Sequence, residues 1–198
     1  MNPTLEVYYD YVSPFAYMAS RLLPDLALRH GAEIAWRPVE LASLSSFDGG
    51  LPYSPSKREY VFVDAARTAR FHGIEIGMPD PFPVDSTLAL RLAVAAVDTA
   101  TFAGLHEALF RAAWVESRNL ADRDELAAVA AAGGRSEAET LELVDDSRWA
   151  DRVAEATAAA DRSGIFGVPT VVYDGEMFWG VDAFPVLEWT LAGRPARR

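Results

Sequence analysis

The sequence predicts an α/β fold in which a β-α-β unit and a later β-β-α unit are separated by a large all-helical insertion. Segments rich in aromatic and β-branched residues, which are typical of strands, lie near the two ends of the chain, at 5–12, 33–39 and 170–179. Between them, about a hundred residues carry helical periodicity. A chain of 198 residues is long enough for one such domain with its insertion.

The first unit is expected to contain a strand at 5–12, a helix at about 14–29 and a strand at 33–39. Gly31 stops the helix. Pro24 lies inside it and removes one backbone donor, so we expect a kink or a nearby break there. Two strands joined through a helix in this way form a right-handed crossover and lie parallel.

A loop at 42–53, marked by Ser, Gly and Pro, leads into the insertion. Helices are predicted at 56–72, 86–97 and 101–115, then from capping boxes at 122–125 and 136–139, with a last one running towards Asp161. Beyond it, strands at 170–173 and 177–179 flank Asp174-Gly175, a pair that favours a type I′ hairpin turn. A helix at 184–191 closes the chain.

Composition excludes several classes of function. The net charge of −11 argues against a nucleic-acid partner, which requires a concentrated basic surface. The sequence shows neither an apolar stretch of the ~20 residues that span a bilayer nor a signal peptide, so a cytoplasmic protein is expected. The chain has no cysteine, which rules out disulfide exchange, and His30, His72 and His106 are too isolated to predict a metal site.

Ser13-Pro14 has the composition of a helix start, with a serine N-cap and a proline at the first helical position. On its own this pair is a capping device. The same place also favours an anion, because the first turn of a helix exposes unpaired N–H groups. A sulfur there would be stabilised as a thiolate, and a serine hydroxyl could donate a hydrogen bond to it. A catalytic triad of Ser13 with one of the histidines is a weaker alternative that the spacing neither supports nor excludes.

Two distant segments together resemble the active site of thioredoxin-like proteins. Tyr9 to Tyr17 ends a strand and opens a helix where those proteins carry Cys-x-x-Cys, but here the two positions are Ser13 and Ala16. Val168-Pro169-Thr170 is similar to their loop with a cis proline, which would let the Val168 backbone pair with a peptide-like ligand. From the local sequence alone, a plain turn before a strand is an equal alternative.

Four motifs resemble the 2-hydroxychromene-2-carboxylate isomerase family, which is related to kappa-class glutathione transferases and has a DsbA-like thioredoxin fold. They are Ser13-Pro-Phe-Ala-Tyr17, Lys57-x-x-Tyr60-x-x-x-Asp64-x-x-Arg67, Phe166-Gly-Val-Pro-Thr170 and Glu176-Met-Phe-Trp-Gly180-x-Asp182. The resemblance implies a glutathione-dependent enzyme. It places the thiol at the catalytic Ser13 and the rest of the tripeptide against Pro14, Phe15, Val168, Pro169, Gly180, Val181 and Asp182.

The substrate side of the family pattern differs in this chain. Residues 41–45 lack the lysine that family members often carry, Asp85 stands where Pro-x-Asn-Ser is usual, and Ala183 replaces a common arginine. Our candidates for substrate contacts share one helix face or lie before the next helix: Lys57, Tyr60, Asp64, Arg67 and Asp85. For the helical stripe, the alternative is a solvent-exposed face with an Asp-Arg pair.

The sequence therefore predicts a DsbA-like thioredoxin domain at 1–45 and 160–198, with a helical insertion at 46–159. The expected function is isomerisation of 2-hydroxychromene-2-carboxylate or a similar conjugated aromatic acid, as in aromatic catabolism, with glutathione or another small thiol as cofactor. The alternatives are a kappa-like glutathione transferase and a non-catalytic binding protein. The family resemblance also implies a homodimer.

Overall fold

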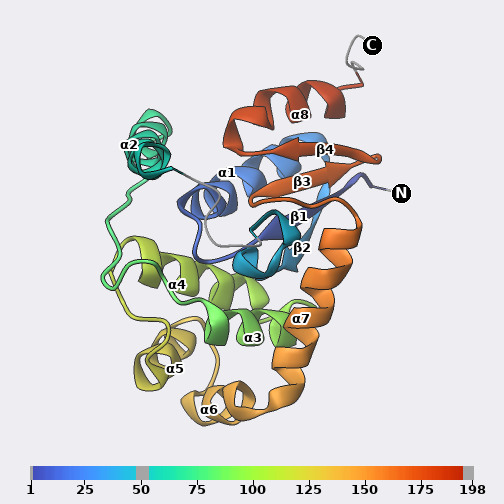
Figure 1. Cartoon of the computed structure of the whole chain (residues 1–198). Helices are drawn as coiled ribbons and strands as arrows, with labels where there is room; N and C mark the ends of the chain where they lie inside the picture. The colour runs from blue at the N-terminus through green and yellow to red at the C-terminus, as the bar shows by residue number, and fades with distance from the viewer. Residues whose placement is uncertain (1, 48–53, 194–198) are drawn as a thin grey trace.

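The computed structural model describes residues 2–47 and 54–193 and shows a four-stranded mixed sheet with helices on both sides (Figure 1). The strands are β1 (Thr4–Tyr9), β2 (Glu33–Pro38), β3 (Thr170–Tyr173) and β4 (Glu176–Trp179). The helices are α1 (Pro14–His30), α2 (Pro55–Phe71), α3 (Thr87–Ala96), α4 (Phe102–Trp114), α5 (Arg123–Ala132), α6 (Glu137–Asp145), α7 (Ser147–Arg162) and α8 (Phe184–Leu191). This is the predicted order of elements.

The sheet has the order β2-β1-β3-β4. β1 and β2 are parallel, as the β-α-β prediction requires, and β3 is antiparallel to both β1 and β4. Asp174 and Gly175, which join β3 to β4, have φ values of 50° and 76°. Positive φ at both positions is the geometry of a type I′ turn, so the hairpin prediction is confirmed.

The N-terminal unit differs from the prediction at one point. β1 ends at Tyr9 and not at residue 12, because the Asp10 side chain accepts a hydrogen bond from the Val12 backbone and turns the chain. α1 then begins at Pro14, continues past Pro24 and ends at Gly31, whose φ is 61°. The helix start therefore lies close to the end of β1.

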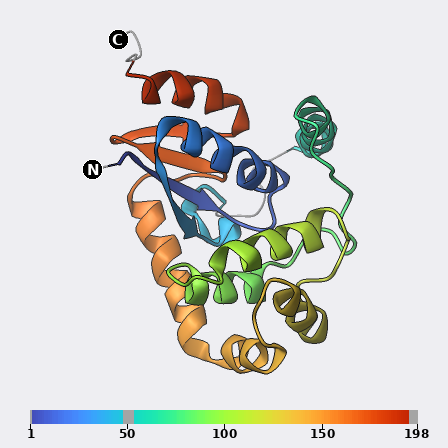
Figure 2. The same ribbon diagram turned by 180° about the vertical axis from the view of Figure 1, so that it is seen from behind.

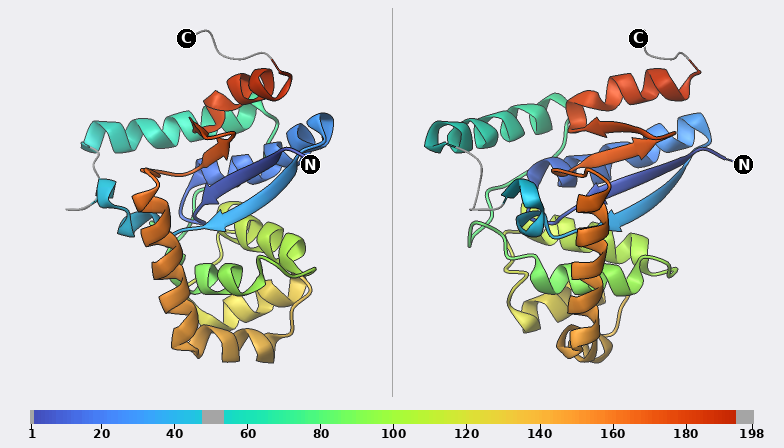
Figure 3. Two further views of the ribbon diagram at one scale, coloured as in Figure 1. Left: turned by 90° about the vertical axis from the view of Figure 1, so that its right-hand side faces the viewer. Right: turned by 45° about the vertical axis from the view of Figure 1, so that its right-hand side comes forward.

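Helices cover both faces of the sheet. α1 and α8 pack on the face that carries Leu5, Val7 and Val171, and α1 is seen in front of the sheet in Figure 2. On the other face, α7 reaches Tyr8 and Val172. Figure 3 shows the sheet between α8 on one side and the group of helices α3 to α6 on the other, with α2 beside α8. No helix in the described part of the chain is long and apolar enough to cross a membrane.

The helical region has a core of its own that joins the end of β1. Tyr9 and Tyr11 pack with Phe110 and Trp114 of α4, and the Trp114 indole donates to the Tyr11 carbonyl over 2.8 Å. α4 and the end of α5 are in close contact at two glycines, Gly104 and Gly133. A Cβ atom on Gly104 would lie 2.8 Å from the carbonyl oxygen of Gly133. Since α4 and α5 meet backbone to backbone there, any added side chain must separate them.

This contact predicts whether one substitution raises or lowers the free energy of unfolding. In an exposed helix interior, replacing glycine by alanine normally stabilises by about 1 kcal/mol, but Gly104→Ala should destabilise by about 1–3 kcal/mol because the methyl group meets fixed backbone. Urea unfolding measures the difference. The matched control is Ala103→Gly, at the exposed neighbouring position, which should cost about 1 kcal/mol through propensity alone. A more stable Gly104→Ala variant would contradict this packing.

Candidate functional site

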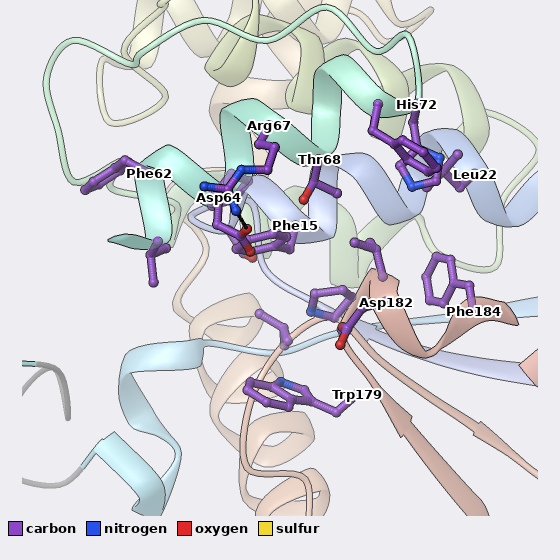
Figure 4. A pocket seen from close by; sticks show the side chains of 18 of the residues that line it. Phe15, Leu22, Phe62, Asp64, Arg67, Thr68, His72, Trp179, Asp182 and Phe184 are labelled. Atoms are coloured by element: carbon purple, nitrogen blue, oxygen red, sulfur yellow. Dashed lines mark hydrogen bonds and ion pairs between the residues drawn. The ribbon is translucent and has the colours of Figure 1, made fainter. Parts of the chain in front are cut away.

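A pocket of about 970 Å³ lies between α1, α2, the loop before β3 and the segment that joins β4 to α8. Figure 4 shows its labelled side chains pointing into one space from these separate elements. Twelve of the thirteen predicted site residues line it: Ser13, Pro14, Phe15, Lys57, Tyr60, Asp64, Arg67, Val168, Pro169, Gly180, Val181 and Asp182. The structure therefore brings together residues that are up to 169 positions apart in the sequence.

Ser13 caps α1 and also lines the pocket. Its Oγ accepts a hydrogen bond from the Ala16 backbone over 3.2 Å, and Pro14 is the first helical residue, as the capping prediction requires. The Ser13 backbone N–H donates to the Asp10 carbonyl over 3.2 Å. Because the bond from Ala16 uses only an acceptor lone pair, the Ser13 hydroxyl keeps its own hydrogen for a ligand.

The loop before β3 faces this helix start. The Val168–Pro169 peptide bond is cis, as the thioredoxin-like resemblance predicts. The Gly180 backbone donates to the Pro169 carbonyl over 2.9 Å, which ties the loop to the end of β4. Val168 and Pro169 are buried, so this wall of the pocket is fixed by packing as well as by that hydrogen bond.

Gly180 has a backbone conformation typical of glycine and lies next to the Asp182 carboxylate. Its φ is 80°, a backbone conformation that residues other than glycine rarely adopt. A Cβ atom at this position would lie 2.5 Å from Oδ1 of Asp182. The Asp182 carboxylate therefore lies against the open side of Gly180, in space that a side chain at position 180 would share. Trp179, which is 49% exposed, packs against the Phe166 ring beside it, with the two ring planes tilted at 56°.

The predicted stripe on α2 forms the opposite wall. Arg67 lies 3.3 Å from the Asp64 carboxylate and 5.9 Å from the centre of the Tyr60 ring, and the Tyr60 hydroxyl donates to Asp64 over 3.5 Å. Lys57 lines the pocket one turn before Tyr60. The stripe is thus largely solvent-exposed and also lines the pocket.

Asp85 is not among the pocket residues. Its carboxylate accepts a hydrogen bond from the Thr87 backbone over 3.0 Å at the start of α3. Sequence reasoning missed apolar pocket residues that come from α1, α2, α8 and the segments around them: Leu22, Leu26, Leu41, Phe47, Phe62, Phe82 and Phe184. Their participation depends on how distant elements pack, and no local motif marks it.

The histidines have other partners than Ser13. His106 is buried in the core, where its Nδ1 lies 3.2 Å from the Tyr11 hydroxyl, and burial lowers the pKa of His106 to about 3. His30 lies 3.3 Å from Glu188. His72 lines the pocket at the far end of α2. The contacts of the described residues thus give no support to the catalytic triad.

Sequence reasoning also missed Asp10, whose fully buried carboxylate lies just below the helix start. It accepts hydrogen bonds from the Val12 backbone (3.1 Å), the Leu41 backbone (2.8 Å) and the Ser86 hydroxyl (2.6 Å). Burial raises the pKa of Asp10 from 3.8 to about 6, and the three hydrogen bonds oppose this rise only in part. An aspartate inside an aromatic run, three residues before an N-cap serine, is the signal that could have identified it.

The raised pKa of Asp10 predicts a pH dependence of stability. Between about pH 4 and pH 6 the folded state binds more protons at this site than the unfolded state, so the free energy of unfolding must fall as the pH rises through this range. The free energy of unfolding should fall by roughly 3 kcal/mol over this range. Urea unfolding from pH 4 to 7 should show this fall in the wild type and a shallower one in Asp10→Asn. Equal pH slopes for the two proteins would contradict the assignment.

Comparison with known proteins confirms the resemblance. A 2-hydroxychromene-2-carboxylate isomerase from Sphingobium xenophagum is 29% identical over 194 residues, which cover 95% of this chain and 97% of the relative. The solved structure of a 2-hydroxychromene-2-carboxylate isomerase superposes with a TM-score of 0.86 and 27% identity, over 96% of this chain and 95% of that one. The rat glutathione S-transferase kappa 1 is 22% identical and covers 94% of this chain, which in turn covers 90% of the transferase.

The isomerases and the transferase all match along nearly their whole length, so this chain is similar to enzymes from end to end. The family model of the DSBA-like thioredoxin domain matches residues 4–192. The chain therefore belongs to the family of DSBA-like thioredoxin domains.

Proposed function

We propose that this protein is a glutathione-dependent isomerase of 2-hydroxychromene-2-carboxylate or a similar conjugated aromatic acid. The observation that carries the proposal is the buried Ser13 hydroxyl at the start of α1, facing Val168 and Asp182 across one pocket in a chain without cysteine. This arrangement suits a thiol that is brought by a ligand. The similarity to named isomerases supports the same reading.

Ser13 and the first turn of α1 stabilise the reactive form of that thiol. The unpaired N–H groups at a helix start carry a partial positive charge, which lowers the pKa of a sulfur placed against them. The Ser13 hydroxyl accepts from Ala16 and donates to the sulfur, so it acts as a hydrogen-bond donor and not as a nucleophile. Bound glutathione supplies a thiolate that adds to the conjugated system, opens the ring C–O bond and departs unchanged after a bond rotation.

The wall formed by the loop before β3 and the segment after β4 positions the peptide part of glutathione. The backbone of Val168 pairs with the cysteinyl residue as a short strand would, and Pro14 and Phe15 border the same space. The Asp182 carboxylate, next to the backbone of Gly180 and Val181, offers a partner for the γ-glutamyl ammonium group.

The α2 wall and the apolar side chains around it receive the substrate. The aromatic rings of Phe15 and Trp179 offer surfaces against which a planar conjugated ring packs. The Lys57 ammonium group suits a carboxylate, and Arg67 is held in place by Asp64 and Tyr60. Asp85 receives no role, because it caps α3 outside the pocket lining. A cytoplasmic location and a homodimer belong to the same proposal.

The experiment follows two quantities in one reaction, the conversion of 2-hydroxychromene-2-carboxylate and the concentration of free thiol. Conversion should require glutathione and leave the thiol concentration unchanged. Ser13→Ala should lower kcat roughly 100-fold, because it removes a hydrogen-bond donor to developing negative charge. The matched control is Ser20→Ala in the same helix, where the hydroxyl donates to the Tyr17 carbonyl outside the pocket lining. It should retain wild-type turnover.

Three results would overturn this proposal in different ways. Stoichiometric loss of thiol would identify a kappa-like transferase, the second candidate, which the similarity to the rat enzyme favours. Equal turnover in Ser13→Ala and wild type would remove Ser13 from the chemistry. A saturable thermal shift with glutathione but no turnover on any conjugated acid would favour the non-catalytic binding protein.

A further inference from the structure

The pocket extends well beyond the part that glutathione would fill. The residues of α1 that line it begin next to Ser13 and continue along the helix through Leu22 and Leu26 to Arg29. At 1.5 Å per residue, positions 13 and 29 are about 24 Å apart. Three α-linked residues span at most about 11 Å even when fully extended, and the γ-peptide link of glutathione lengthens its chain by two carbon atoms. Glutathione with its sulfur at Ser13 therefore leaves a large part of the groove length open.

The open part is a second compartment between α1, α2 and α8. Its apolar walls are formed by Leu22 and Leu26 of α1, Phe71 of α2 and Phe184 of α8. Phe71 is 82% exposed, so a large ring lies in contact with solvent at the groove edge.

Figure 4 shows how this compartment relates to the thiol site. Leu22, His72 and Phe184 gather on one side of Asp182, whereas Phe62 lies at the opposite end of the view. Asp182, the proposed partner of the γ-glutamyl end, thus stands between the two parts of the pocket. α8 begins only two residues after it. An arm that leaves the thiol towards Asp182 and continues in the same direction enters the second compartment.

The electrophilic substrate does not account for this compartment. A substrate must meet the sulfur at the start of α1, at the other end of the groove from Arg29. The far end is reached most directly by the arm of the thiol itself, because that arm already points past Gly180 and Asp182. The length of the groove therefore favours a longer thiol over a longer substrate.

The charges at the far end indicate what kind of arm fits. Both Nε and Nη2 of Arg29 donate to one Glu188 oxygen, over 3.1 and 2.8 Å, and these bonds, with that of His30, lower the pKa of Glu188. The arginine charge is thus already matched by a carboxylate. Asp25 adds a second carboxylate to the lining. Two carboxylates disfavour a phosphate but accept hydrogen bonds from hydroxyl groups.

We propose that the preferred thiol of this pocket is longer than glutathione and carries a neutral, hydroxyl-rich arm that lies between α1, α2 and α8. The hydroxyl groups donate to Asp25 and Glu188, and the C–H faces of the arm pack on Phe71 and Phe184. This inference rests on the proposed thiol-dependent function, since it fixes the sulfur at Ser13.

Calorimetric titration with three thiols tests the inference. The probes are glutathione, N-acetylcysteine joined by an amide to an amino-disaccharide, and coenzyme A, whose longer arm carries phosphates. The disaccharide thiol should bind at least tenfold more tightly than glutathione, and coenzyme A more weakly than the disaccharide thiol. Phe71→Ala should weaken only the disaccharide thiol, about tenfold. The matched control is Val63→Ala, an exposed α2 position outside the pocket lining, which should change neither affinity.

The outcomes separate this inference from the function on which it rests. If glutathione binds and the disaccharide thiol binds no more tightly, or if Phe71→Ala affects both equally, the second compartment has no role and the glutathione site stands. Tightest binding of coenzyme A would overturn the neutral arm. Binding of none of the three thiols would overturn the proposed function and this inference with it.

Discussion

The buried carboxylate of Asp10 connects the segments that shape the pocket. Its three hydrogen bonds reach the loop before α1 at Val12, the segment after β2 at Leu41 and the start of α3 at Ser86. Val12 and Leu41 themselves line the pocket. Ionising the Asp10 carboxyl group away from water costs free energy, and the three hydrogen-bond donors reduce that cost without removing it. Asp10 thus exchanges some stability at neutral pH for a fixed geometry around Ser13.

Under the proposed function, that geometry lets a thioredoxin-type site work without cysteine. The helix start supplies N–H groups and a hydroxyl, the loop at Val168 supplies a backbone edge, and Asp182 supplies a carboxylate beside Gly180. None of these groups is itself a strong nucleophile, which is why we propose that the reactive sulfur comes from a ligand. The α2 wall, joined to α1 by few contacts, leaves the space in which that ligand and a substrate can meet.

The predictable parts of the structure are those with local physical causes. Ser13-Pro14 caps a helix and Asp174-Gly175 turns a hairpin because their own conformational preferences demand it. The end of β1 was predicted three residues too late, because Tyr11 and Val12 continue the aromatic and β-branched pattern of the strand. The strand is interrupted by the hydrogen bond between the Asp10 side chain and the Val12 backbone. The compartment at Leu22 and Phe184 had no local signal, because it exists only where α1, α2 and α8 converge.

The central claim is that the start of α1, with Ser13, holds the sulfur of a bound small thiol as a thiolate. The protein contains no cysteine, so at pH values below the titration of tyrosine the thiolate absorbance in the ultraviolet comes from the ligand. A pH titration of the saturated glutathione complex measures the pKa of the bound thiol directly. The account predicts a pKa at least one unit below the ordinary thiol value of about 8.5, and a smaller reduction in Ser13→Ala. An unshifted pKa in the saturated wild-type complex would contradict it.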